Sequence, residues 1–134
     1  MHRDDGGVLH LLGRVLQRHA ALWAAGLPDM TKTQWAGLRA IAATPGRDQR
    51  TIGAGTGVDK ATLTPLVARL AQRASISYDA DPADRRRRLL VLTPAGREVV
   101  ERMAPLVAAV DAATLAPLAE HERARLRELL ARLA

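Results

Sequence analysis

The chain of 134 residues is long enough for one domain with a modest core, and its 48% of hydrophobic residues exclude a chain disordered by composition. It lacks cysteine, which excludes disulfides, thiol redox sensing and cysteine-ligated zinc. The net charge of +6 is compatible with a nucleic-acid partner. Because the first residues are polar and no apolar run reaches about 18 residues, we expect a cytoplasmic protein without a membrane span.

The first predicted element is an amphipathic helix over residues 8–27. Its apolar residues recur at helical spacing and form a wide stripe: Leu9, Leu11, Leu12, Val15, Leu16, Leu22 and Trp23. A stripe this wide in a small chain indicates burial against more than one surface.

Two shorter helices are predicted next. Thr31 and Gln34 match a capping box, which starts a helix to about Ala43. Its inward residues are expected to be Trp35, Leu38, Ile41 and Ala42. Asp48 is expected to cap a third helix that ends near Thr56 and Gly57.

Asp59 is expected to cap a fourth helix, with a buried stripe at Leu63, Leu66, Val67 and Leu70. Lys60, Thr62, Thr64, Pro65 and Arg69 lie off that stripe. Pro65 leaves two alternatives open: a bent first turn, or Thr64 as a second N-cap.

A basic β-hairpin is predicted after the fourth helix, with strands near residues 75–79 and 87–92. The run Asp84-Arg85-Arg86-Arg87-Arg88 gives it a cationic tip that can enter a narrow, negative minor groove. Strand alternation should send Arg85 and Arg87 to one side and the other two arginines to the opposite side. We expect Asp84 to orient one guanidinium by a bidentate pair. The alternative is a solvated loop.

Two helices are predicted to complete the chain. Thr93 is the expected N-cap and Pro94 the first residue of a long helix to about Leu118, with a kink at Pro105. The last helix covers residues 120–133. Together with the first helix, this pair is too long to pack only on the middle of the chain, which indicates a helical dimer interface.

Three motifs follow one another at suitable distances. They are T-x-x-Q-W-x-x-L from Thr31, the segment from Val58 to Val67, and D-P-x-D-x-R followed by a strand and L-T-x-x-G from Asp81 to Gly96. With them the chain resembles the MarR family of bacterial transcription regulators over nearly its full length. Ala74 stands where the family commonly has glycine. Residues 62–66 resemble the peroxide-sensing branch, whose cysteine is missing here.

The resemblance implies a mainly α fold with a β-hairpin wing. Residues 31–93 would be the winged helix-turn-helix region, and residues 8–27 and 94–134 the dimerisation helices of a single MarR-like domain. It implies a homodimer on a pseudo-palindromic operator of double-stranded DNA, with the fourth helix in the major groove and the wing in the minor groove. The matching positions, which become the candidate DNA-binding residues, are Lys60, Thr62, Thr64 and Arg69 on the fourth helix, with Pro65 among them, and Asp84, Arg85, Arg86 and Arg87 on the wing. For the face of the fourth helix, the alternative is ordinary solvation.

Family members usually repress nearby genes and release DNA when a small aromatic acid or an oxidant binds. Candidate residues for an aromatic cleft with cationic groups are His10, Arg14, His19, Trp23, Trp35 and Arg39. The alternative is that the tryptophans are core residues and the others surface or dimer contacts.

No metal site, cofactor site or catalytic signature is recognisable, so an enzyme is not expected. The resemblance to the MarR family then implies a sequence-specific DNA-binding repressor released by a small aromatic acid-like effector. The other hypotheses are a ligand-independent architectural DNA binder and a winged-helix module that binds an acidic protein.

Overall fold

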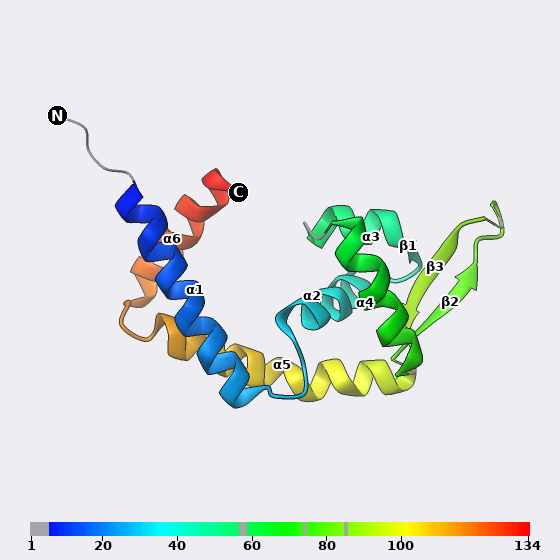
Figure 1. The fold of residues 1–134 in the computed structure, drawn as a ribbon, viewed down its shortest axis with the longest axis horizontal. Coiled ribbons are helices and arrows are strands. Elements are labelled where there is room, and N and C mark those ends of the chain that lie inside the picture. The colour runs from blue at the N-terminus through cyan, green and yellow to red at the C-terminus, as the bar shows by residue number, and fades with distance from the viewer. Residues whose placement is uncertain (1–5, 57–58, 74, 85) are drawn as a thin grey trace. The chain divides into compact units, whose positions relative to one another are not determined.

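The computed structural model describes residues 6–134, apart from residues 57–58, 74 and 85 (Figure 1). In chain order the elements are α1 (Gly6–Gly26), α2 (Lys32–Ala43), β1 (Arg47–Asp48), α3 (Gln49–Thr56), α4 (Lys60–Gln72), β2 (Ile76–Ala80), β3 (Arg88–Leu92), α5 (Pro94–Leu115) and α6 (Glu120–Leu133). The predicted mainly helical fold with a β-hairpin is confirmed. The predicted stop at Gly57 and the helix-to-wing turn at Ala74 lie outside the described residues.

The chain divides into two compact units. Residues 29–105 form one, which we call the winged unit. The described residues up to Pro28, together with Leu106–Ala134, form the other, which we call the helical unit. Helix α5 runs through Pro105 and contributes to both.

Side-chain caps fix the starts of the helices in the winged unit, as the sequence predicts. The Thr31 hydroxyl accepts a hydrogen bond from the Gln34 N–H at 3.0 Å, and the Gln34 side chain accepts one from the Thr31 N–H at 3.1 Å. One Asp48 carboxylate oxygen accepts the Thr51 N–H at 2.8 Å. These bonds satisfy amide groups that the first turn of a helix leaves without partners.

The core of the winged unit consists of apolar side chains from α2, α3, α4 and the sheet: Leu38, Ile41, Ile52, Leu63, Leu66, Val67, Leu70, Ile76 and Leu90. Helices α2 and α4 approach closely, since a Cβ on Gly37 would lie 3.0 Å from a Leu66 methyl carbon. Trp35 is only half-buried and Ala42 is exposed, which corrects their prediction as inward residues. The buried side of α2 is narrower than predicted. Trp35 and Ala42 lie just outside it, each directly after a buried residue in the sequence.

The sheet has three antiparallel strands in the order β1-β3-β2. The hairpin strands β2 and β3 agree with prediction, and Tyr78 pairs with Leu90. Strand β1 was not predicted, because two residues are too few to show an alternating pattern. Its Asp48 pairs with Leu89, which attaches the segment before α3 to the wing.

The helical unit has a small core of Trp23, Leu27, Val107 and Val110. The other end of the predicted α1 stripe is exposed, as is the end of α6. The exposed apolar residues there are Val8, Leu9, Leu11, Val15, Leu16, Leu129, Leu130 and Leu133. Among the described residues no single helix is long and apolar enough to cross a membrane, although α5 and the bent continuation into α6 pass that test as a pair.

Candidate nucleic-acid interface

Helix α4 presents a polar face opposite its buried stripe. Its N-cap is Asp59, whose carboxylate accepts the Thr62 N–H at 2.8 Å, and the helix continues through Pro65. Thr64 is therefore not a second N-cap. All five candidate reading residues are exposed: Lys60, Thr62, Thr64, Pro65 and Arg69.

Asp59 fixes a negative charge at the N-terminus of α4. Hydrogen bonds from the hydroxyl and the backbone amide of Thr62 lower the pKa of this carboxyl below its ordinary value. The carboxylate also interacts favourably with the positive end of the helix dipole. The Thr62 hydroxyl hydrogen is thus directed to the cap, and its oxygen lone pairs and methyl group remain for an external partner.

A contact between α3 and α4 involves a residue that sequence reasoning missed. The side-chain amide of Gln49 donates a hydrogen bond of 2.9 Å to the Thr64 hydroxyl. The Thr64 hydroxyl hydrogen can then still be donated outward. No spacing rule marks Gln49 in the sequence, because the contact depends on how the two helices cross.

A shallow groove runs between the start of α2 and the exposed face of α4. It is lined by Thr31, Thr33, Gln34, Thr62, Pro65, Leu66 and Arg69. Hydroxyl groups at the start of α2 therefore lie beside three of the candidate reading residues, Thr62, Pro65 and Arg69. The sequence indicated Thr31 only as a cap, and Thr33 was not singled out.

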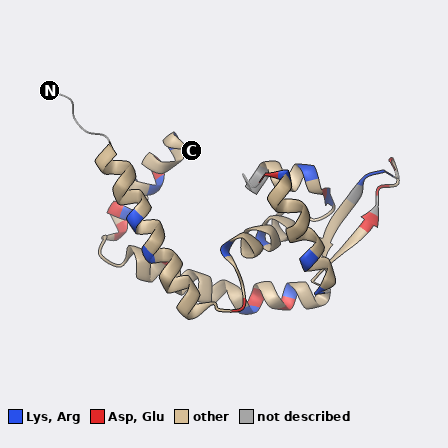
Figure 2. Ribbon diagram, viewed as in Figure 1, with Lys and Arg blue, Asp and Glu red and all other residues tan. Residues whose placement is uncertain are grey.

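The tip of the wing is a turn held by aspartates. The Arg86 N–H donates to the Asp84 carboxylate at 3.0 Å, and the Ala83 N–H donates to the Asp81 carboxylate at 2.9 Å. Both acids thus have structural roles in the turn. Arg85 lies outside the described residues. Figure 2 shows further lysine and arginine along α3, α4 and the β3 side of the wing.

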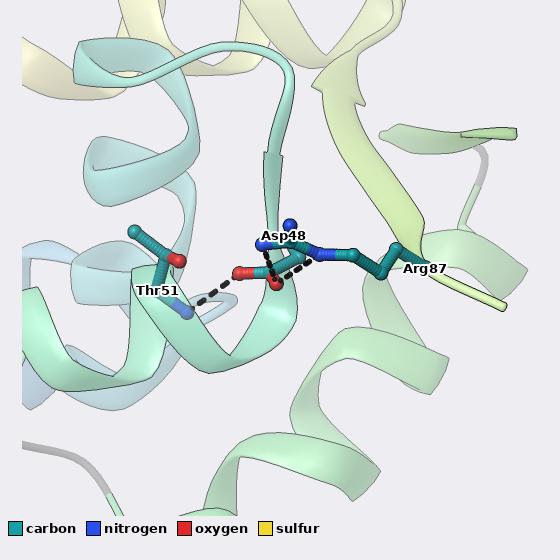
Figure 3. Close-up of polar contacts among 3 residues, drawn as sticks. All are labelled: Asp48, Thr51 and Arg87. Atoms are coloured by element: carbon teal, nitrogen blue, oxygen red, sulfur yellow. Dashed lines mark hydrogen bonds and ion pairs between the residues drawn. The ribbon is translucent and has the colours of Figure 1, made fainter. Parts of the chain in front are cut away.

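Arg87 has a partner that the sequence did not reveal (Figure 3). Its Nε and Nη2 donate to one oxygen of Asp48 at 2.9 and 2.6 Å. Asp84 was expected to orient a guanidinium, but for Arg87 Asp48 does so, because pairing of β1 with β3 brings Asp48 alongside. Arg87 also precedes β3, so the predicted strand alternation does not apply to it.

The Asp48 carboxylate is strongly stabilised in its charged form. Hydrogen bonds from Thr51 and from the Arg87 guanidinium lower its pKa far below the ordinary value. The same interaction raises the pKa of Arg87. Both shifts favour the charged forms of the pair.

The six candidate effector residues are divided between the units. His10, Arg14, His19 and Trp23 lie on α1 in the helical unit. Trp23 is buried there, and His19 Nε2 lies 2.7 Å from an oxygen of Asp111.

The other two candidates lie on α2 in the winged unit. The guanidinium carbon of Arg39 is 5.8 Å from the centre of the Trp35 ring, a cation–π distance. In the described part of the chain, no group of three or more histidine, aspartate or glutamate side chains is placed to hold a metal ion.

Comparison with known proteins identifies the family. The MarR family profile matches residues 26–87. The chain is 36% identical over 124 residues to the transcriptional regulator HosA of Escherichia coli O111:H-, covering 92% of each chain. The chain belongs to the MarR family. It is therefore a DNA-binding transcriptional regulator, a class of proteins that are not enzymes.

Solved structures of other regulators share the fold of this MarR-family chain. PcaV of Streptomyces coelicolor in complex with its natural ligand is 38% identical with a TM-score of 0.89, covering 99% of this chain and 96% of PcaV. BpsR of Bordetella bronchiseptica is 32% identical with a TM-score of 0.92, covering 99% and 96%. The BpsR structure concerns regulation of DNA binding by 6-hydroxynicotinic acid.

Proposed function

We propose that this MarR-family regulator is a homodimeric repressor of a pseudo-palindromic operator, released by a small aromatic carboxylate. The observation that carries the proposal is the exposed polar face of α4, held over a buried apolar stripe in the same unit as a basic wing. Residues 31–93 bind DNA, and residues 8–27 and 94–134 form the dimer.

Helix α4 reads the major groove in this proposal. Lys60 and Arg69 bind phosphate or guanine, and Thr62 and Thr64 contact base edges or thymine methyl groups. Pro65 presents an apolar surface within the same face. The exposure of all five residues on this helix supports this docking.

The wing enters the adjacent minor groove. Asp84 shapes the turn by accepting the backbone N–H of Arg86, which leaves the Arg86 side chain exposed. Arg85, which matches the family's wing motif, would be a second DNA-binding cation. A narrow minor groove carries a strong negative potential, which favours inserted arginine.

The exposed apolar residues of α1 and α6 form the dimer interface. Eight such side chains would remain in water in a monomer. A two-fold axis then presents two copies of α4 about one DNA turn apart, which matches a pseudo-palindromic operator.

A small aromatic carboxylate releases the DNA. The support is the likeness to PcaV and BpsR, together with the arginine, histidine and tryptophan side chains on α1 and α2. The candidate side chains remain His10, Arg14, His19 and Trp23 on α1 and Trp35 and Arg39 on α2; an arginine would bind the carboxylate and a tryptophan would contact the ring. The ligand must favour a conformer that fits the operator less well.

Footprinting on the DNA upstream of the gene tests this function. We expect two protected half-sites about one helical turn apart, lost on adding 6-hydroxynicotinic acid or a similar aromatic acid. Protection that no aromatic acid removes would reject the effector. Uniform protection of any duplex would indicate an architectural binder, and no protection would indicate a protein-interaction module.

A further inference from the structure

Arg87 uses both its main chain and its side chain inside the winged unit. Its N–H donates to the Asp84 carbonyl oxygen at 3.0 Å, and its carbonyl oxygen accepts the Asp81 N–H at 3.2 Å. Its guanidinium donates twice to Asp48. Arg87 therefore closes the base of the wing turn and joins it to β1.

Asp48 connects two parts of the DNA-binding surface through one carboxylate. One oxygen caps α3 by accepting the Thr51 N–H, and the other holds Arg87 (Figure 3). The Asp48 side chain is 15% exposed and that of Arg87 is 52% exposed, so the contact is partly shielded from water. Water screens a partly shielded ion pair less than an open surface pair, so its interaction energy depends more strongly on the distance and orientation of the two groups.

We propose that Arg87 is a positioning residue, which fixes the wing against the start of α3 and does not act as a DNA-contacting cation. This rests on the proposed function, in which the wing docks into DNA. A phosphate would have to compete with a carboxylate already 2.6 Å from the guanidinium. If Arg87 bound a DNA phosphate instead, the Asp48 carboxylate would be left unpaired near the negatively charged DNA, which is unfavourable.

The neighbouring Arg86 provides a matched control. Its backbone N–H bonds to Asp84, and its exposed side chain does not depend on that bond. The proposal therefore assigns different roles to adjacent arginines of one run. Arg86 contributes charge to the DNA interface, and Arg87 contributes the orientation of the wing.

The test compares Arg87→Ala, Asp48→Ser, the double variant and Arg86→Ala. Serine keeps the cap on α3 and removes the partner of Arg87. Operator affinity is measured across a salt series. Hydrogen exchange of the Asp81 amide, which bonds to the Arg87 carbonyl, is measured on the free protein by NMR.

We expect Arg87→Ala and Asp48→Ser each to weaken operator binding about 10-fold, and the double variant to bind no more weakly than either, because coupled residues are not additive. In these variants the salt slope, which is the slope of the logarithm of operator affinity against the logarithm of salt concentration, stays as in the unmodified protein. The Asp81 amide exchanges faster. Arg86→Ala instead lowers the salt slope and leaves the exchange unchanged.

The proposal is overturned if Arg87→Ala lowers the salt slope by about 0.9 per wing. It is also overturned if the losses in the double variant multiply, or if the Asp81 amide exchanges at its normal rate in Arg87→Ala. Failure of the proposed wing docking is distinguishable, since Arg86→Ala would then leave both affinity and salt slope unchanged. The exchange measurement, made without DNA, decides the Arg87–Asp48 link in that case.

Discussion

Gly96, in the first turn of α5, lies directly against the main chain of Ser75, at the start of the wing. A Cβ on Gly96 would lie 1.9 Å from the Ser75 carbonyl oxygen. That same oxygen accepts the Thr93 N–H at 3.1 Å, and the Thr93 hydroxyl accepts the Gly96 N–H at 3.0 Å. The close approach locks the start of the wing to the start of α5.

We predict that Gly96→Ala destabilises the protein by about 1–3 kcal/mol or more, because the obstructing atom is backbone and cannot rotate away. Gly13→Ala is the matched control. It lies within α1, where a Cβ meets nothing within 4 Å, and should stabilise by up to about 1 kcal/mol. Urea unfolding measures both, and equal effects of the two substitutions would contradict the account.

The capping carboxyls predict a loss of stability in acid. The pKa values of Asp48 and Asp59 are lowered in the folded state by hydrogen bonds, and for Asp48 also by Arg87. Their contribution to the free energy of unfolding is therefore complete above the unfolded pKa of about 3.9 and is lost as the pH falls toward the folded pKa. Urea unfolding from pH 7 to pH 3 should show this decline.

Asp48→Asn should lose less stability over the same pH interval, since asparagine caps a helix without titrating. An identical pH dependence in this variant would show that Asp48 is not one of the groups responsible.

The exposed apolar residues of α6 predict where the dimer can be broken. Leu129→Asp places a charge among side chains that we propose to be covered by a second copy, and burying an unpaired charge is strongly unfavourable. Sedimentation should show a dissociated protein with weaker operator binding. The control is Arg125→Ala, on the same helix, whose exposed ion pair with Glu128 contributes little. A dimer that survives Leu129→Asp places the interface elsewhere.

We predict that substituting Thr62 changes the selectivity of the protein for operator over scrambled DNA. Thr62→Val removes the hydroxyl group and keeps a methyl group, so operator binding should weaken by about 1–3 kcal/mol if the hydroxyl reads a base, with little change for scrambled DNA. Lys60→Ala should instead weaken both duplexes alike and lower the salt slope. Competition binding measures the ratio, and equal losses on both duplexes after Thr62→Val would exclude base reading.

Local signals made much of the winged unit predictable. The caps at Thr31, Asp59 and Thr93 depend on side chains within three residues of the amides they bind, so the sequence shows them directly. The buried stripe of α4 follows from helical spacing alone, and it leaves the reading face exposed.

Contacts between distant segments were not predictable. The Asp48–Arg87 pair depends on a two-residue strand whose partner β3 lies far along the chain, and the strand pattern of β3 does not show that β1 pairs with it. Similarly, the apolar stripe of α1 shows which face of the helix is apolar, but it does not show which part of that face remains exposed to solvent in a single chain. Trp23 is buried there, whereas Leu9 and Leu16 are exposed.

Binding of the purified protein to its own upstream DNA and to a scrambled duplex of the same length, across a salt series, tests the central claim most directly. The account predicts a preference for the upstream DNA of about 10³-fold or more, and affinity for both duplexes that falls steeply with salt. Equal, weak binding to the two duplexes at every salt concentration would contradict it.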